Sequence, residues 1–305
     1  MVTTFRANVS RWTTSPRLVS IFRRGSTTYF YSSLFFSGSV RRDVFALYAF
    51  VRTADDFVDG VPQDVAGFER FVAGYRAALG GVPSGEVVID SFVELSGRTR
   101  FDPAWTESFF AAMQRDVQPR AYETISELED YMYGSAEVIG LFMSRVLDLP
   151  DTAQPAARRL GKAMQYANFL RDVAEDHELG RTYVPRQVLE QHGLASLGPD
   201  HVAQHPERFA SLMRHEIARY RRWEDQAEAG FRFLAPRVRI PVQTAAGMYR
   251  WTMDEIERDP HVVYTRRLKP RPTRVVASVA RNALTTALPG PDKWSVPLSR
   301  LTPWR

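Results

Sequence analysis

The sequence has no cysteine and no long hydrophobic run, and each absence excludes a class of protein. Without cysteine among its 305 residues, the chain can form no disulfide, no thiolate–metal site and no cysteine nucleophile. Its longest apolar run, 44–51, is far shorter than the roughly 20 residues that a membrane-spanning helix needs. Strand-like alternation of apolar and polar residues is almost absent. We therefore expect a soluble, helical protein of a reducing compartment and predict a cytoplasmic location.

Charge is distributed unevenly along the chain. Residues 1–30 carry five arginines and no acid, and residues 261–305 carry nine basic residues and one acid, Asp292. Residues 31–260 therefore hold 26 bases and 34 acids, a net charge of −8, although the whole chain has +5. An acidic body between basic ends points to an anionic partner. We expect no nucleic acid, because the basic ends contain no recognisable binding motif and the acidic body repels phosphate backbones.

Turn residues divide the sequence into helical segments and leave no linker between domains. Gly60, for example, ends the first long segment, and the helix near residue 124 is expected to begin with a capping pattern from Ser126 to Glu129. The prediction is one all-α domain over 1–305, with a core of about 20–285 between a basic N-terminal and a Pro-rich C-terminal extension. Helices are predicted at 39–59, 64–79, 87–97, 103–117, 124–147, 153–178, 205–234, 238–258 and 273–287, with a short one after Pro185.

The first of two unusual stripes lies in the segment 39–59. Tyr48, Arg52, Asp55 and Asp59 recur at i, i+4, i+7 and i+11, so they share one helical face. Asp56 lies beside them, and the rest of the segment is strongly apolar. The second stripe lies in the segment 153–178 and repeats the spacing of the two acids, with an arginine directly before the first. Its members are Gln165, Asn168, Arg171, Asp172 and Asp176.

Two carboxylates one helical turn apart repel each other, so each pair needs a cation nearby. Arginine neighbours, protonation or a divalent ion could supply the compensation. Oxygen ligands without cysteine, in a chain whose six histidines are scattered, favour Mg²⁺ or alternatively Mn²⁺. Two such stripes facing each other could hold a diphosphate through bridging metal ions and assist its departure. The alternative is that each stripe is a solvated helix edge, and spacing alone leaves both open.

Five segments resemble the squalene/phytoene synthase family, and together they extend over about 20–285. The resemblance implies an isoprenoid-synthase fold, a single domain of α-helices around a central cavity with both aspartate-rich helices at its mouth. It also implies a prenyltransferase that joins two identical allylic diphosphates through a cyclopropylcarbinyl diphosphate and releases diphosphate. The segments are Ser26-x-Thr28-Tyr29, the R-x₆-Y-x₃-R-x₂-D-D-x₂-D pattern of 41–59, the first signature at 131–140, the second at 160–176, and Arg181-x-Tyr183-x-Pro185.

The resemblance further implies roles for individual residues. The catalytic residues are Tyr48, Arg52, Asp55, Asp59, Asp172 and Asp176. The metal ligands are Asp55, Asp56, Asp59, Asn168, Asp172 and Asp176. The residues that bind the substrate diphosphate are Ser26, Thr28, Arg52, Gln165, Asn168, Arg171, Arg181, Tyr249, Arg266 and Arg267.

The expected reaction is the coupling of two geranylgeranyl diphosphates to phytoene through prephytoene diphosphate, with Mg²⁺ and without NADPH. One alternative is a dehydrosqualene or squalene synthase that uses farnesyl diphosphate. Another, from a different class, is a non-catalytic family member that acts as an assembly or prenyl-binding factor. Such a protein should have lost metal-binding aspartates, and all of them are present here.

One residue bears on how the substrate fits, and the nature of the product bears on whether the protein contacts a membrane. Glu137 stands where the family usually has a small residue, so it bears on substrate fit and not on the type of reaction. The very apolar product makes a peripheral membrane contact reasonable, for which Trp294 and Trp304 beside basic residues are candidates. The sequence gives neither the oligomeric state nor the double-bond geometry of the product.

Overall fold

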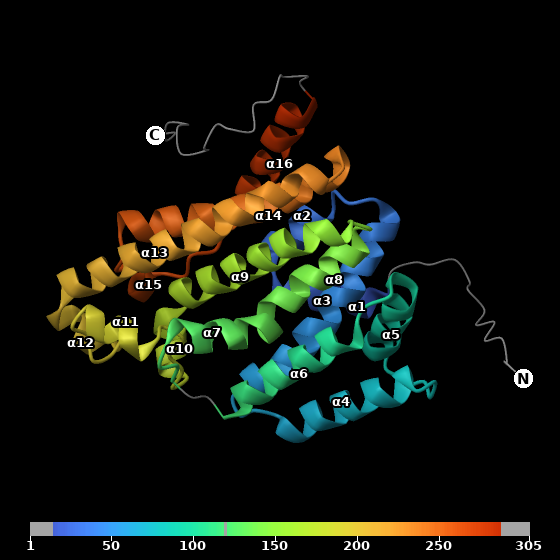
Figure 1. The fold of residues 1–305 in the computed structure, drawn as a ribbon, viewed down its shortest axis with the longest axis horizontal. Helices are drawn as coiled ribbons and strands as arrows, with labels where there is room; N and C mark the ends of the chain where they lie inside the picture. Colours follow the sequence, from blue (N-terminus) through green and yellow to red (C-terminus); the bar gives the residue numbers. More distant parts are fainter. Residues whose placement is uncertain (1–14, 119–120, 288–305) are drawn as a thin grey trace, which may run out of the picture.

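The computed structural model describes residues 15–118 and 121–287, which form α-helices joined by short turns (Figure 1). No strand occurs in these two ranges, which confirms the all-α prediction. Most of the long helices run along the long axis of the molecule, whereas α16 projects from one side. Trp294 and Trp304 lie outside the described residues.

The helices in the first half of the described chain are α1 (Pro16–Gly25), α2 (Thr27–Ser33), α3 (Gly38–Asp59), α4 (Val65–Leu79), α5 (Val87–Thr99), α6 (Pro103–Val117), α7 (Ile125–Met132) and α8 (Val138–Val146). Those in the second half are α9 (Gln154–Arg171), α10 (Val173–Glu178), α11 (Arg186–Gln191), α12 (Pro199–Gln204), α13 (Pro206–Glu228), α14 (Pro236–Arg258), α15 (Val262–Thr265) and α16 (Pro272–Ala287).

The helix predicted at 124–147 differs from the structure at its start and in its middle. Thr124 caps α7, because its hydroxyl accepts a hydrogen bond from the backbone N–H of Glu127 at 3.3 Å. The predicted cap at Ser126 is therefore wrong. Between α7 and α8 the backbone widens into a π-helical turn, Tyr133–Glu137. The predicted single helix is in fact two helices joined by this turn.

Helix α9 runs through the middle of the molecule and packs against α8, α13, α14 and the π-helical turn. Two glycines permit the close approach. A Cβ atom at Gly161 would lie 2.4 Å from the carbonyl oxygen of Ala136, and one at Gly140 would lie 2.2 Å from that of Ala157. Most buried hydrophobic side chains form one cluster that extends from α1 to the segment after α15. The single domain over 1–305 stays a prediction.

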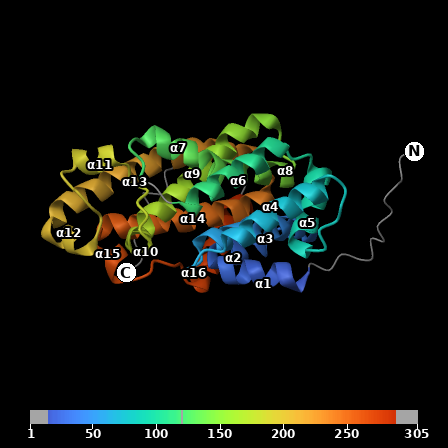
Figure 2. The ribbon, with the colours of Figure 1, turned by 90° about the horizontal axis from the view of Figure 1, so that it is seen from below.

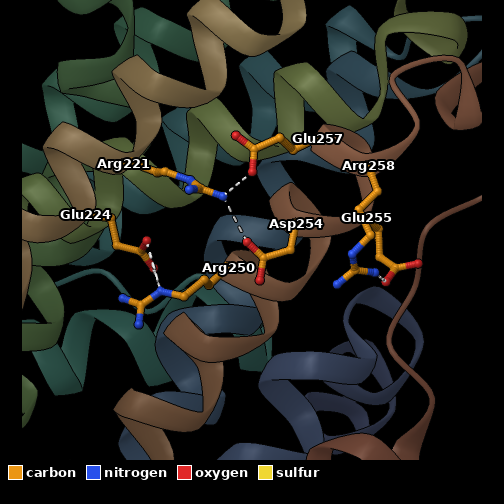
Figure 3. Close-up of polar contacts among 7 residues, drawn as sticks. All are labelled: Arg221, Glu224, Arg250, Asp254, Glu255, Glu257 and Arg258. Carbon is orange, nitrogen blue, oxygen red and sulfur yellow. Dashed lines mark hydrogen bonds and ion pairs between the residues drawn. The ribbon is translucent and has the colours of Figure 1, made fainter. Parts of the chain in front are cut away.

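Ion pairs hold α14 against α13 (Figure 3). Arg221 of α13 contacts Asp254 at 3.1 Å and Glu257 at 2.5 Å. In the opposite direction, Arg250 of α14 donates to Glu224 of α13 at 3.2 Å. Because Arg250 follows Tyr249 directly, these contacts fix the part of α14 that carries Tyr249.

No helix within residues 15–118 and 121–287 is both long enough and apolar enough to span a bilayer.

Candidate active site

The first acidic stripe occupies the C-terminal half of α3. Arg52 forms an ion pair with Asp56 one turn later, at 2.5 Å. Asp55 lies on the same half of the helix and is partly buried. Its pKa is raised well above the usual range, chiefly because burial removes the carboxylate from water and also because Asp59 lies close by. Asp59 is the last residue of α3, and its side chain is 44% exposed.

The second stripe spans the junction of α9 and α10. The sequence predicts one helix over 153–178, but the structure has a break at Asp172, where φ is −98° and ψ is 17°. The backbone N–H of Asp172 nevertheless donates to the carbonyl of Asn168, and that of Asp176 to the carbonyl of Asp172, both at 2.8 Å. The two aspartates therefore stay one turn apart. The pKa of Asp176 is raised to about 8, chiefly by burial and secondly by the negative charge of Asp172.

Arg181 links the two stripes. Its Nη1 donates to Oδ1 of Asp59 at 2.6 Å, across 122 residues of sequence, and its Nη2 donates to the carbonyl of Val58 at 2.9 Å. Its backbone N–H donates to the carbonyl of Asp176 at 2.8 Å. Asp59 also contributes to the raised pKa of Asp176. The structure thus brings the ends of the two stripes face to face.

Arg171 pairs with the aspartate that follows it. Its Nε and Nη2 donate to the two carboxylate oxygens of Asp172 at 2.7 and 2.5 Å. This fork-like geometry suits guanidinium recognition of a carboxylate and equally of a phosphate. Arg171 therefore holds Asp172 with a group that could instead contact a diphosphate.

Tyrosines lie beside the first stripe. The ring of Tyr48 stacks on Phe22 with the centroids 3.9 Å apart. Tyr29 of α2 lies with its ring centroid 5.9 Å from that of Tyr249 on α14, and its hydroxyl donates to the sulfur of Met164 at 3.3 Å. Burial raises the pKa of both Tyr29 and Tyr48, so both phenols stay protonated. Tyr29, for which no role is predicted from the sequence, thus neighbours both predicted tyrosines, since its ring centroid also lies 6.4 Å from that of Tyr48.

Ser26 and Thr28, both predicted to bind diphosphate, lie at the start of α2. The hydroxyl of Ser26 accepts a hydrogen bond from the backbone N–H of Tyr29 at 3.2 Å, so it caps the helix. Thr28 follows in the first turn and is partly buried.

The two amides of the second stripe contact each other. Nδ2 of Asn168 donates to Oε1 of Gln165 at 3.3 Å. Oδ1 of Asn168 is buried and accepts no hydrogen bond in the described part of the protein. A buried acceptor without a donor is uncommon and indicates a place for a missing donor or cation.

Arg266 and Arg267 border a pocket beside the second stripe. The pocket has a volume of about 330 Å³, and Arg171, Asp172 and Glu175 also line it. Arg266 donates to Glu255 at 3.2 Å, and Arg267 forms an ion pair with Glu175. The structure therefore brings these two arginines, on the segment that follows α15, to the same pocket as Arg171.

Sequence reasoning missed Asp116 at the end of α6. Its carboxylate accepts a hydrogen bond from the hydroxyl of Tyr131 at 2.8 Å. Burial raises its pKa to about 7, while Tyr131 and the positive charge of Arg181 lower it. Asp116 has no acidic partner at helical spacing on α6, so no local pattern could reveal that it lies near Arg181 and Asp59.

The residues of the two stripes fit a hard divalent cation in their chemistry. They offer carboxylate and amide oxygens and a buried Asn168 Oδ1 without a donor. They also include two acids, Asp55 and Asp176, whose pKa values are raised chiefly by burial and next by a neighbouring carboxylate. Within residues 15–118 and 121–287, however, no three acidic or histidine side chains already converge as a ready-made metal site. Mg²⁺ commonly takes only one or two protein carboxylates and completes its shell with water and substrate phosphate.

Comparison with known sequences gives consistent matches. A family model described as squalene/phytoene synthase matches residues 22–275. A 15-cis-phytoene synthase of Synechocystis sp. is 32% identical over 256 residues, which cover 79% of this chain and 75% of that protein. A 15-cis-phytoene synthase of Paracoccus sp. is 28% identical over 288 residues, 91% of this chain and 90% of that protein.

Solved structures show the same arrangement of helices. Squalene synthase HpnC from Alicyclobacillus acidocaldarius has a TM-score of 0.72 at 23% identity, over 80% of this chain and 93% of that one. A dehydrosqualene synthase solved in complex with a ligand has a TM-score of 0.74 at 20% identity, over 88% and 94%. At these identities the likeness concerns the fold.

Proposed function

The chain belongs to the squalene/phytoene synthase family and is a prenyltransferase, and from this we propose that it joins two geranylgeranyl diphosphates head to head. The product is phytoene, formed through prephytoene diphosphate with release of diphosphate. The observation that carries the proposal is the Arg181 bridge, which brings two acidic stripes together in a chain that is 32% identical to a 15-cis-phytoene synthase.

We propose Mg²⁺, with Mn²⁺ as an alternative, as the metal of this site. Its ligands would be Asp55, Asp56, Asp59, Asn168, Asp172 and Asp176. When bound, the metal supplies positive charge that neutralises the departing diphosphate. The buried Asn168 Oδ1 without a donor and the raised pKa values of Asp55 and Asp176 support this assignment, because both features point to a missing cation.

The arginines of the site contact the substrate diphosphate in this proposal. Arg52, Arg171 and Arg181 are paired with carboxylates at 2.5 to 2.6 Å in the structure. If a cation takes over those carboxylates, the guanidinium groups become free to donate to diphosphate oxygens, which they can bind as forks. The further diphosphate contacts are proposed to be Ser26, Thr28, Gln165, Asn168, Tyr249, Arg266 and Arg267.

The tyrosines act on the hydrocarbon part of the substrate. Tyr48 is the proposed catalytic residue among them, because it lies one turn before Arg52 and two turns before Asp55 on the face of α3 that carries the acids. The π faces of Tyr48, Tyr29 and Tyr249 can stabilise a carbocation. Their burial excludes water that would otherwise capture the cation.

Purified protein should be incubated with Mg²⁺ and either geranylgeranyl or farnesyl diphosphate, with and without NADPH. The expected result is a C40 hydrocarbon from the C20 substrate, with a mass that does not depend on NADPH. A C30 product from the C15 substrate together with no C40 product would contradict the phytoene proposal and favour the dehydrosqualene or squalene alternative. No product from either substrate, with the protein folded, would favour a non-catalytic family member.

The isoprenyl diphosphate substrate has a charged head and a long apolar chain, and the product has no charge. We therefore propose that the protein works in the cytoplasm with a peripheral contact to a membrane. The apolar product supports this contact, because a bilayer is the phase in which such a hydrocarbon dissolves.

A further inference from the structure

Three helices along one side of the protein contain no acidic residue of their own. The first acid of the sequence is Asp43, and none lies between Asp259 and Asp292. Helices α1, α2 and α16, together with the turn from α2 to α3, therefore have no carboxylate side chain. Helix α2 packs against both α1 and α16, and Figure 2 shows the three helices along the same side of the molecule. We call these three helices and the turn the acid-free surface.

The cations on the acid-free surface are largely unpaired. Arg23 and Arg24 end α1 and are exposed, and Arg281 is exposed on α16. In the described ranges, none of these three forms an ion pair, whereas Arg17 of α1 reaches Glu86 of α5 at 2.9 Å. Elsewhere in those ranges, arginines such as Arg76 and Arg98 are matched by carboxylates. The acid-free surface therefore has an uncompensated positive charge.

Large apolar side chains are also exposed on this surface. Four of the eight large hydrophobic residues that are exposed in the described chain belong to it: Leu34 at 40%, Phe35 at 44%, Val276 at 51% and Leu284 at 67%. Leu34 and Phe35 follow α2, where Arg41 donates to the carbonyl of Leu34 at 3.4 Å. Exposed apolar residues together with unpaired cations are typical of a protein surface that binds the interface of a membrane.

Helix α16 is apolar on two sides. Val275 and Val279 face inward and are buried, and Asn282 donates to Thr244 of α14 at 3.0 Å, so this side is anchored. Val276, Ala280 and Leu284 follow at i, i+4 and i+8 and form an outward stripe. Arg281 lies next to this stripe on the helical wheel. The outward stripe has no partner among the described residues.

We propose that the acid-free surface docks on an anionic lipid bilayer. Leu34, Phe35, Val276 and Leu284 enter the interface, and Arg23, Arg24 and Arg281 contact lipid phosphates. Basic residues near an anionic membrane surface are attracted to it, and the attraction weakens with added salt. The exposed apolar residues favour a bilayer over a nucleic acid, because a phosphodiester backbone gives them nothing to bury against.

The acid-free surface lies close to the candidate active site, so docking on a bilayer could help to release an apolar product. Helix α16 packs on α2 and α14, which carry Tyr29 and Tyr249. An apolar product formed beside these tyrosines would then lie one layer of helices from the bilayer. This use rests on the proposed function, but the docking itself does not.

The test uses the full chain without substrate and measures its flotation with vesicles. The vesicles contain phosphatidylcholine alone or phosphatidylcholine mixed with phosphatidylglycerol. We expect binding to the mixed vesicles that weakens with added salt. The triple variant R23E/R24E/R281E should lose at least about tenfold in its partition coefficient, since three attractions to lipid phosphate become repulsions. The double variant V276S/L284S should lose severalfold.

Two control variants change matching residues on α4 and the turn that follows it. Arg70→Glu changes an exposed arginine, and Val82→Ser changes a valine that is 64% exposed. Both should bind the vesicles as wild type does. Wild-type protein that does not float with the mixed vesicles would overturn the proposal, and so would a triple variant that floats equally well. Binding to duplex DNA that the triple variant loses while vesicle binding persists would assign the surface to nucleic acid.

Turnover in detergent solution separates this proposal from the proposed function. The surface variants should keep wild-type turnover there, because none of the changed residues contacts the site. A protein that floats as expected but makes no product would refute the proposed function and leave the docking intact.

Discussion

Ion pairs neutralise the acids of the site unequally. Arginines hold Asp56, Asp59 and Asp172 at 2.5 to 2.6 Å. Asp55 and Asp176, one in each stripe, form no ion pair within the described ranges, and both have raised pKa values. Positive charge is therefore lacking at one aspartate of each stripe. A bound cation would therefore interact most favourably with these two aspartates. It would offset the cost of burying their carboxylates and their repulsion by neighbouring acids.

Replacement of Asp55 or Asp172 by alanine should abolish turnover, with a loss of at least about 10³-fold, because each stripe must hold positive charge opposite the leaving diphosphate. The measurement is product formation with Mg²⁺ at saturating substrate. Asp200→Ala, at an exposed aspartate of α12, is the matched control and should keep full activity. An Asp172→Ala variant that folds and remains active would contradict the two-stripe mechanism.

Asp116 should make stability depend on pH in a predictable direction. Its pKa of about 7 in the folded protein lies above the usual aspartate value, so the folded state binds more protons than the unfolded chain between these values. Its contribution to the free energy of unfolding is therefore present in acid and is lost as pH rises toward 7. Asp116→Asn keeps an acceptor for Tyr131 but removes this titration.

Urea unfolding at pH 5 and pH 8, without metal, measures the effect. We expect the difference in free energy of unfolding, variant minus wild type, to be larger at pH 8 than at pH 5. The increase should be on the order of 2 kcal/mol, since each pKa unit corresponds to about 1.4 kcal/mol. Taking the difference between the free energies of unfolding of the two proteins removes the contribution of other titrating groups. An equal difference at the two pH values would show that Asp116 is not held protonated by the fold.

At the scale of elements, local patterns predicted helices well and their interruptions poorly. The segment 39–59 is observed as Gly38–Asp59, because its apolar spacing and its terminal glycine are local signals. Thr124 and Ser126 each precede a glutamate by three residues, so local chemistry could not decide which one caps α7. At the π-helical turn, Gly134 packs so closely on α6 that a Cβ would lie 2.3 Å from the carbonyl oxygen of Ser108, and no local window contains this contact.

The close contact of α9 with the π-helical turn makes Gly161 intolerant of a side chain. Gly161→Ala places a Cβ 2.4 Å from a backbone oxygen, and separating the helices should cost about 1–3 kcal/mol in the free energy of unfolding. Gly97 on α5 is exposed with nothing near its Cβ position, so Gly97→Ala should stabilise the protein by about 0.5–1 kcal/mol. Urea unfolding of both variants checks the two signs, and a neutral Gly161→Ala would show that the helices separate easily.

At the scale of the whole molecule, the spacing of each stripe was predicted from the residues, but their juxtaposition was not. Helical periodicity placed Asp55 with Asp59 and Asp172 with Asp176, and only the resemblance to a family implied that the pairs face each other. The Arg181–Asp59 contact joins residues 122 positions apart and is set by the packing of the whole bundle. Packing of the whole bundle also places Asp116 near Arg181 and Asp59, and no pattern in its own helix indicates this position.

Because the two stripes belong to different parts of the chain, a ligand that holds both should stabilise the entire fold. Mg²⁺ together with inorganic diphosphate should raise the melting temperature by several degrees, since saturation at a hundredfold excess over Kd contributes about 2.7 kcal/mol. Either component alone should give less than half of that rise, because each lacks the partner charge, and EDTA should reverse it. Asp172→Asn should lose most of the shift, whereas Asp200→Asn should keep it. Equal shifts in wild type and Asp172→Asn would mean that the ligand binds elsewhere, and the two stripes would then be structural rather than a binding site.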